Sequence, residues 1–293
     1  MTKYYALPLA TKYWKPGDNY LDIILEALEK KVADGDFVVI SEKALSTALG
    51  RIIDERGVNP GFGAKVIARL WMRVVWGRFL SVLCRFGPNL SRRLREYPFE
   101  AGSRHKQVVL RQAGLLQALM WGSEGGVDGS NLPFSYVSLP LDNACGLAGE
   151  VRRQILRRLG KKVFVVIADS DKTYSFRNFY FTPRPKPMRG IHSVGGVVAY
   201  VMGRVFGFRR RPTPLAVAGG EVGVREALVV ANVADRVRGP GSGVSVWDMA
   251  AGFGVGVTGV SWGMLGGVRH KPVVLVRRSV ERPVGKRLGS FAE

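Results

Sequence analysis

The stretch from residue 144 to 171 restricts the possible folds more than any other part of the sequence. Residues 144–159 (ACGLAGEVRRQILRRL) have the periodicity of a helix that ends at Gly160, and residues 163–167 (VFVVI) form a wholly apolar, strand-length run. That run leads directly into Asp169, Ser170 and Asp171. A helix, a buried strand and an acidic loop in this order indicate a helix-flanked sheet, with ligand-binding groups where the strand ends.

Other segments predict the same mixture of elements. With 293 residues, of which 46% are hydrophobic, the chain can bury a large core. We therefore expect an α+β fold with mixed sheets and flanking helices, and a basic, proline-containing connection between Pro88 and Pro98. The expected helices are 18–33, 41–50, 61–86, 104–120 and 223–236, and the expected strands are 37–40, 214–218 and 272–277.

The domain organisation is less strongly marked. The stretch 183–189 (PRPKPMR) has the composition of an exposed linker, which predicts one region at 1–182 and a second at 183–293. A single intertwined domain is the alternative. Residues 122–133 (GSEGGVDGSNLP) are too rich in glycine for a regular element and are expected to form a loop at a functional site.

The charge indicates which kinds of partner the protein can attract, and the cysteine content indicates the cellular compartment. A formal net charge of +21 predicts attraction to anions, among them phosphorylated substrates, nucleic acid and membrane surfaces. Only two cysteines and no secretory signal pattern predict a reduced, cytoplasmic setting. Segments 64–86 and 249–267 are apolar, but repeated arginines in the first and many glycines in the second disfavour a membrane span.

Candidate chemistry rests mainly on acidic residues in loops. There is no GxxxxGK[ST] motif, and the three histidines are far apart in the sequence, which disfavours a P-loop and a zinc site. Asp128, between glycines, and Asp169, at the end of an apolar run, could hold a hard divalent ion, or could simply shape turns. Residues 238–243 (RGPGSG) could cradle a phosphate or merely connect two elements.

Several of these segments resemble the coenzyme F420-0:gamma-glutamyl ligase family. DGDFVVISEKALSTALGR at 34–51 is similar to the family's DGDVVVVAQKIVSKAEGR, which implies nucleotide contacts at Glu42 and Lys43. Thr47 stands where the family has a nucleotide-binding lysine. The segment LPLA resembles the family's LPxI, whose backbone contacts the nucleotide, and its residues are Leu7, Pro8, Leu9 and Ala10.

The resemblance also assigns roles in three later segments. GGVDGSN is similar to AGIDxSN, which implies that Asp128 is a metal ligand and Asn131 a nucleotide contact. Asp169 and Ser170 would be further metal ligands, but the GR pair that follows in the family is absent, and Arg177 is the candidate replacement cation. ADRVRGPGSG resembles a second nucleotide loop, with Gly239 as an additional metal ligand through its carbonyl; the loop residues are Arg238, Gly239, Pro240, Gly241, Ser242 and Gly243. Residues 244–268 look like an insertion.

This resemblance implies a GTP-dependent ligase that adds L-glutamate to an acidic acceptor such as coenzyme F420-0 through an acyl phosphate. It also implies Mg²⁺ or Mn²⁺, with K⁺ as a further candidate, and a homodimer. The basic charge fits three anionic substrates. Two alternatives remain open: a related ligase with another acceptor or nucleotide, and a relative that binds nucleotide or nucleic acid without turnover.

Overall fold

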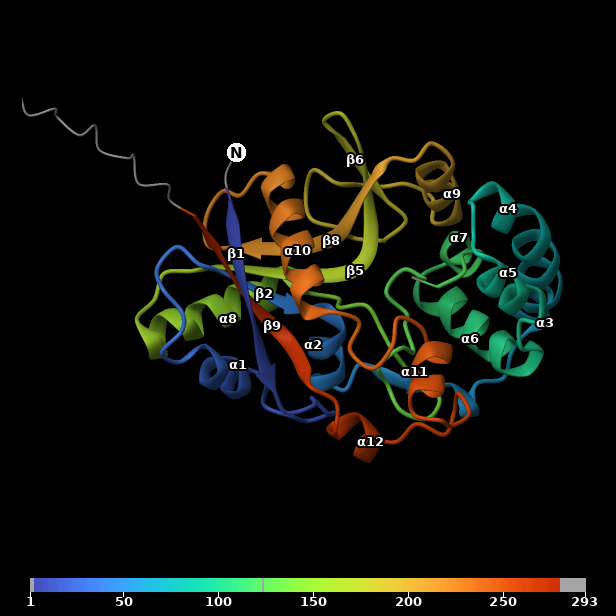
Figure 1. Cartoon of the computed structure of the whole chain (residues 1–293), viewed down its shortest axis with the longest axis horizontal. Helices are drawn as coiled ribbons and strands as arrows, with labels where there is room; N and C mark the ends of the chain where they lie inside the picture. The colour runs from blue at the N-terminus through green and yellow to red at the C-terminus, as the bar shows by residue number, and fades with distance from the viewer. Residues whose placement is uncertain (1–2, 123, 280–293) are drawn as a thin grey trace, which may run out of the picture.

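The computed structural model describes residues 3–122 and 124–279, and its centre is a mixed sheet (Figure 1). The strands lie in the order β1-β9-β2-β5-β6-β7, and β8 pairs with β5. The α+β fold with mixed sheets is confirmed. The strands are β1 (Tyr4–Thr11), β2 (Phe37–Ser41), β5 (Phe164–Phe176), β6 (Phe179–Thr182), β7 (His192–Ser193), β8 (Arg209–Ala218) and β9 (His270–Arg278), while β3 (Ile52–Asp54) pairs with β4 (Tyr136–Ser138).

Helices cover both faces of the sheet. Alternation along β2 sends Val38 and Ile40 into a core shared with α1 (Tyr20–Leu28), α2 (Glu42–Ala48) and α8 (Ala144–Leu159). Phe37 and Val39 enter the opposite core, beneath α10 (Val224–Arg238). Because both faces are buried, these strands read as continuous apolar runs, which is why they were predictable from the sequence.

A separate helical lobe lies to the right of the sheet in Figure 1. It begins with three helical segments that follow one another directly: α3 (Phe62–Val66), the π-helical η2 (Ile67–Leu80) and α4 (Ser81–Leu83). The remaining helices are α5 (Pro88–Arg95), α6 (Phe99–Gln112) and α7 (Leu115–Ala118). Trp76, Met72 and Val109 are in its core. None of the helices in the described ranges combines the length and apolar character of a membrane span.

Two expectations about these helices were wrong. The proline-containing connection at 88–98 contains α5, because Pro88 occupies the first turn, where its missing N–H costs nothing. The expected helix 104–120 is divided at Gly114, whose φ of +99° ends α6 before α7 begins. Helix α9 (Val197–Val205) was not expected at all.

The two predicted regions contribute to one sheet. Strand β5 lies before residue 183 and β8 after it, and they pair from Val165↔Ala218 to Ser175↔Arg209. The expectation of an exposed linker at 183–189 was wrong, because Arg184 is buried. Residues 244–268 contain α11 (Val246–Gly252) and α12 (Trp262–Gly266), which pack around a small core of their own.

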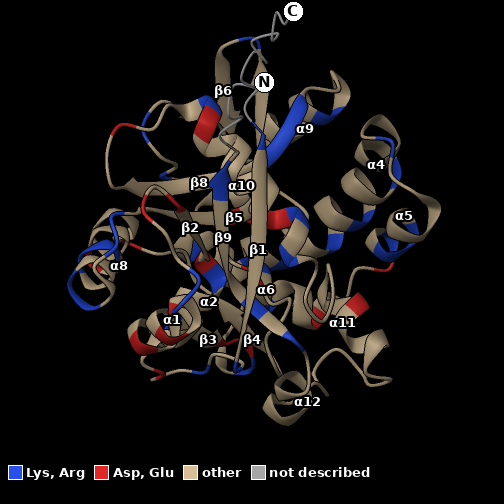
Figure 2. Cartoon of the chain, turned by 60° about the vertical axis from the view of Figure 1, so that its left-hand side comes forward, with Lys and Arg blue, Asp and Glu red and all other residues tan. Residues whose placement is uncertain are grey.

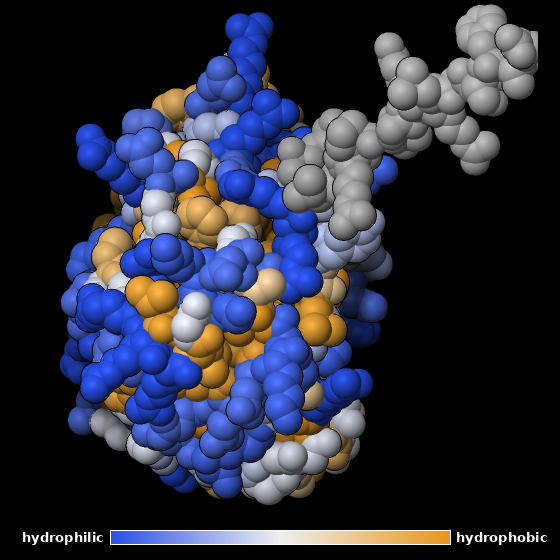
Figure 3. Space-filling model, turned by 90° about the vertical axis from the view of Figure 1, so that its left-hand side faces the viewer, coloured by the Kyte–Doolittle hydropathy of each residue, from blue (hydrophilic) through white to orange (hydrophobic). Residues whose placement is uncertain are grey.

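Charged residues are distributed over most of the molecule. Figure 2 colours lysine and arginine positions blue, and stretches of them lie on α8 and on α5, well separated from each other. On the face drawn in Figure 3, hydrophilic residues surround a central apolar area. The basic charge is therefore not concentrated in one obvious stripe.

Candidate functional site

Asp128 lies in a loop between the sheet and the helical lobe, next to the start of α2. Lys43 of α2 contacts its Oδ2 and also donates to the Ser130 hydroxyl at 2.6 Å. The Ser130 backbone N–H donates to Asp128 Oδ1 at 2.7 Å. Burial alone would raise the pKa of Asp128, but Lys43 and Ser130 outweigh it and hold the pKa below its usual value. Asp128 is therefore ionised, and its negative charge is paired with Lys43.

Asp169 lies inside strand β5 rather than in a loop after it. The expectation that the strand ends there was wrong, because β5 runs on to Phe176 and residues 172–176 pair with β8 and, from Tyr174, with β6. The pairing shifts between Ile167 and Ala168 and again between Asp169 and Lys172, and such irregularities re-aim side chains at functional sites. Ser170 is exposed beside this bulge.

The cation beside Asp169 is Arg184, a role that was not predicted from the sequence. Its Nη1 donates to Asp169 Oδ2 at 2.8 Å, its Nη2 contacts Glu42, and Asp171 Oδ2 lies 3.9 Å from Nη1. Arg177, the candidate from sequence, lies at the β5–β6 turn against Phe176. Residues 172 and 173, at the position of the family's GR pair, lie inside β5, and the cation beside Asp169 comes instead from Arg184, beyond the β5–β6 hairpin.

A glycine makes room for this buried guanidinium. Gly126 has a φ of +95°, and a Cβ built on it would collide with the Arg184 guanidinium group. The first half of GGVDGSN therefore packs against Arg184, and the second half carries Asp128. One short segment consequently joins the surroundings of both carboxylates.

Glu42 is buried between these groups. Its Oε1 accepts a hydrogen bond from the Leu141 backbone N–H at 2.9 Å and is contacted by Arg184. Burial raises the pKa of Glu42 to about 7, with Arg184 opposing the rise and Asp169 adding to it. In this structure Glu42 holds Arg184 rather than projecting from the surface.

Asn131 connects the Asp128 loop to the predicted nucleotide loop. Its Oδ1 accepts from the Ser242 N–H and hydroxyl at 2.7 Å each, and its Nδ2 donates to the Gly243 carbonyl at 3.1 Å. The Tyr13 hydroxyl donates to the Asn131 carbonyl at 2.6 Å. Hydrogen bonds thus join residues that are separated by more than a hundred positions in the sequence.

The remaining predicted nucleotide contacts are Thr47 in α2 and residues 7–10 in β1. Thr47 is buried, and its hydroxyl donates to the Lys43 carbonyl at 2.8 Å, which leaves its side chain occupied within α2. Leu7, Pro8, Leu9 and Ala10 lie in the edge strand β1, where a proline is tolerated; Leu9 is buried, and Leu7 is exposed. Among the described residues, no side-chain hydrogen bond or ion pair joins them to Asp128 or Asp169.

Arg238 ends helix α10, and Gly239, with a φ of +74°, caps it. The Nε and Nη2 atoms of Arg238 are buried without a hydrogen-bond partner in the described part of the chain. Burial lowers the pKa of Arg238, although Asp235 and Asp169 oppose the change. Buried guanidinium N–H groups without hydrogen-bond partners are suited to an anionic ligand.

One histidine has acidic neighbours that its sequence context does not reveal. His105 Nδ1 lies 2.6 Å from Glu55 and its Nε2 lies 3.0 Å from Glu124, which also pairs with Lys106 at 2.7 Å. Burial disfavours the charged ring, but both glutamates outweigh it and raise the pKa of His105 to about 10. A protonated imidazole cannot ligate a metal, so this cluster joins the lobe's elements as an ion network.

The residues that the resemblance assigned to a metal offer oxygen atoms only, and both carboxylates are paired with a cation in this structure, Asp128 with Lys43 and Asp169 with Arg184. No cluster of three or more histidine, cysteine or acidic residues capable of holding a metal occurs among the described residues. Mg²⁺ commonly uses only one or two carboxylates, with phosphates and waters completing its coordination. The carboxylates of Asp128 and Asp169 and the exposed hydroxyl of Ser170 are donors of the type that Mg²⁺ uses together with phosphates, rather than an all-protein cage.

The fold and this site define a mixed α/β protein with two acidic groups, each paired with a cation, beside a glycine-rich loop. The family model for F420-0:gamma-glutamyl ligase matches residues 8–214. The chain belongs to this family.

Two curated relatives differ in how much of the chain they match. An uncharacterized protein of Methanocaldococcus jannaschii is 38% identical over 244 residues, covering 79% of this chain and 83% of the relative. A coenzyme F420:L-glutamate ligase of Archaeoglobus fulgidus is 28% identical over 160 residues, covering 54% of this chain and 55% of that protein. The chain thus spans about half the length of the relative whose name states an activity.

Proposed function

We propose that this protein is a GTP- and divalent-metal-dependent ligase that adds L-glutamate to an acidic acceptor such as coenzyme F420-0. The observation that carries the proposal is the joining of Asp128 and Asp169 through Gly126, Arg184 and Glu42, next to the loop that Asn131 holds. Membership of the family supports glutamate ligation, and the name of the Archaeoglobus relative supports the F420 acceptor.

In the proposed reaction, an oxygen of the acceptor carboxylate forms a bond to the γ-phosphorus of GTP, and GDP leaves. The glutamate amine then attacks the acyl carbon, inorganic phosphate leaves, and the amine loses a proton. Lys43, Arg184 and Arg238 supply positive charge around three anionic reactants, and buried cations of this kind stabilise charge that develops in phosphoryl transfer.

A divalent ion, Mg²⁺ or Mn²⁺, would neutralise phosphate charge when bound. Asp128, Asp169 and Ser170 would hold it with the Gly239 carbonyl, and K⁺ is a further candidate near the phosphates. Lys43 would move from Asp128 toward a phosphate oxygen as the ion binds, because the carboxylate cannot fully satisfy both cations. Asn131 and residues 238–243 would position the nucleotide, together with the backbone of residues 7–10.

A second candidate is a related ligase that uses another nucleotide or acceptor. The specific observation is Thr47, which stands at the family's lysine position and whose hydroxyl is bonded to the Lys43 carbonyl. One phosphate contact is therefore missing. A relative that binds nucleotide or nucleic acid without turnover is the third possibility, and it predicts binding without GDP release.

Product analysis tests the proposal directly. The full chain is incubated with Mn²⁺, L-glutamate, F420-0 and either GTP or ATP, and GDP, ADP and glutamylated product are quantified by mass spectrometry. GTP-dependent product supports the first candidate, and product with ATP alone supports the second. Nucleotide binding without any product would contradict both.

A further inference from the structure

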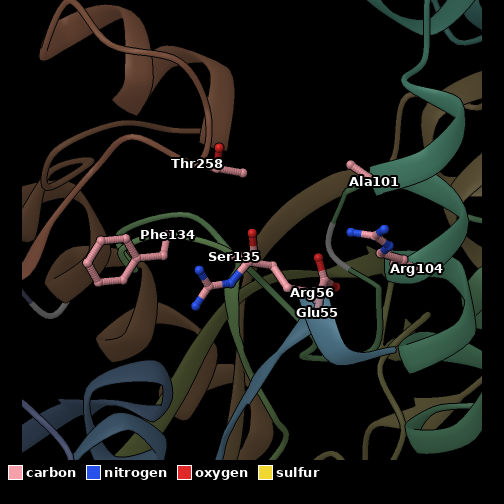
Figure 4. Close-up of a pocket in the computed structure, with 7 residues that line it drawn as sticks. All are labelled: Glu55, Arg56, Ala101, Arg104, Phe134, Ser135 and Thr258. Carbon is pink, nitrogen blue, oxygen red and sulfur yellow. The ribbon is translucent and has the colours of Figure 1, made fainter. Parts of the chain in front are cut away.

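A cavity of about 320 Å³ lies between the Asp128–Ser138 segment, helix α6 and the insertion 244–268 (Figure 4). Phe134 and Ser135 form one wall, Ala101 and Arg104 of α6 form another, and Thr258 of the insertion closes a third side. None of these residues was assigned a role from the sequence. The volume suits a small ligand or one segment of a larger one.

The cavity has one uncommitted cation. Arg56 is paired with Asp54 at 2.6 Å, and the charge of Glu55 is balanced by His105. No hydrogen bond or ion pair engages the side chain of Arg104 among residues 3–122 and 124–279, and its guanidinium group points from α6 toward the cavity in Figure 4. The charge that remains in the cavity is therefore the positive charge of Arg104. Its planar guanidinium group can donate two parallel hydrogen bonds, which suits a carboxylate or phosphate.

The wall formed by Phe134 and Ser135, across the cavity from Arg104 in Figure 4, has a constrained backbone. Phe134 has a φ of +54° and Asn131 a φ of +59°, a left-handed conformation that is uncommon for residues other than glycine. The Phe134 N–H donates to the Val260 carbonyl at 2.8 Å, so the insertion helps to hold this conformation. Backbone strain that the surrounding structure maintains is concentrated at functional sites, where it presents groups to ligands.

The cavity is also close to the nucleotide loop. Asn131, which binds Ser242 and Gly243, is three residues from Phe134. Three residues of chain span at most about 10 Å. A substrate anchored in the cavity could therefore extend to the site of Asp128 and the nucleotide loop without a large movement of the protein.

We propose that this cavity is a subsite for an anionic group of a second substrate, held by Arg104 and partly enclosed by the insertion. The inference rests on the proposed function, because it assigns the subsite to a co-substrate of the ligase. Its ligand chemistry is a carboxylate or phosphate attached to a small organic group. L-Glutamate and the acceptor both carry such a group, and they are the two sources that the experiment separates.

The test is isothermal titration of L-glutamate and, separately, of F420-0 into the full chain, with Mn²⁺ and GDP and again without them. Arg104→Gln removes the charge, and Ala101→Trp fills the cavity without changing the charge. Arg111→Gln is the matched control, because Arg111 is an exposed residue of the same helix and does not line the cavity. Melting temperatures and GDP affinity are recorded for each variant to show that the fold and the nucleotide site are intact.

We expect wild type to bind one of the two ligands, which identifies the source. Arg104→Gln and Ala101→Trp should weaken that binding at least about tenfold, as expected for losing a charge-assisted contact, and Arg111→Gln should not. Unchanged binding in Arg104→Gln, or no binding of either ligand by wild type under both conditions, would overturn the inference. Arg104-dependent binding in a protein that binds no nucleotide would preserve the subsite and reject the ligase.

Discussion

Asp128 and Asp169 are both held by a cation, but the two arrangements are built differently. Lys43 reaches Asp128 from the neighbouring helix α2, and its side chain is 20% exposed while that of Asp128 is 31% exposed. Arg184 reaches Asp169 from beyond the β5–β6 hairpin, and its side chain is 2% exposed while that of Asp169 is 10% exposed. The first pair is accessible to solvent, whereas the second is part of the core.

This difference in exposure indicates different roles for Arg184 and Lys43. A buried, multiply bonded Arg184 is costly to move, because Glu42, Asp169 and Asp171 would be left as uncompensated buried charges. Lys43 can exchange Asp128 for another anion at lower cost, since water reaches both groups. We therefore expect Arg184 to maintain the structure of the site and Lys43 to respond to ligands.

The largest effect is expected for Arg184→Met. Removing one partner of a buried ion network leaves its carboxylates uncompensated, which should lower the free energy of unfolding by about 3–5 kcal/mol. Urea denaturation of wild type and variant measures it. Arg189→Met removes the same charge from an exposed position and should cost little. Equal small losses in both variants would contradict a structural role for Arg184.

A somewhat smaller effect is expected for Gly126→Ala. The new Cβ would collide with the Arg184 guanidinium and would occupy a left-handed conformation, so we expect a loss of about 2–3 kcal/mol. Gly17→Ala is the control, because Gly17 has a φ of +85° but nothing within 4 Å of the added atom. The comparison of the two melting curves isolates the collision from the backbone strain, and identical shifts would argue against close packing at Gly126.

Glu42 should make stability depend on pH. Its pKa is raised to about 7 in the folded protein from an ordinary value of 4.5, so its contribution to stability is present below pH 4.5 and is lost as pH rises toward 7. The slope for one proton is at most about 1.4 kcal/mol per pH unit. Glu42→Gln should flatten the stability profile between pH 4.5 and 7. A variant profile parallel to that of wild type would show that Glu42 remains ionised throughout.

The smallest effect on stability is expected for Lys43→Met. Both partners are partly exposed, so the loss should be about 1 kcal/mol, while nucleotide affinity should fall more strongly. Lys65→Met, an exposed substitution outside the site, controls for the change in net charge. If Lys43→Met destabilised the fold as much as Arg184→Met, the proposed division between the two pairs would be wrong.

The sequence predicted the parts of the site that depend on local pattern. Helix 144–159 and its end at Gly160 agree with α8, because a left-handed glycine after a periodic run is a strong stop signal. The resemblance implied nucleotide contacts at Asn131 and at residues 238–243, but the hydrogen bonds that join Asn131 to Ser242 and Gly243 were not predicted. The helix and its stop depend on residues within one short segment, which is why the sequence reveals them.

Arg184 could not be found in this way because its role depends on a hairpin that separates it from Asp169 in sequence. Pro183 and Pro185 on either side of it favoured an exposed linker, and burial of an arginine between two prolines has no local signature. The missing GR pair did indicate that a cation had to come from elsewhere. Choosing between Arg177 and Arg184 required the pairing of β5 with β6. The homodimer and the cytoplasmic setting remain predictions.

The central claim is that Asp128 and Asp169 form one metal-dependent nucleotide site. Isothermal titration of GTP, GDP and ATP into wild type, Asp128→Asn and Asp169→Asn, with and without Mn²⁺, tests it most directly. We predict Mn²⁺-dependent guanine-nucleotide binding by wild type and a loss of at least about tenfold in each variant. Nucleotide binding that does not require metal, or that survives both substitutions, would contradict the claim.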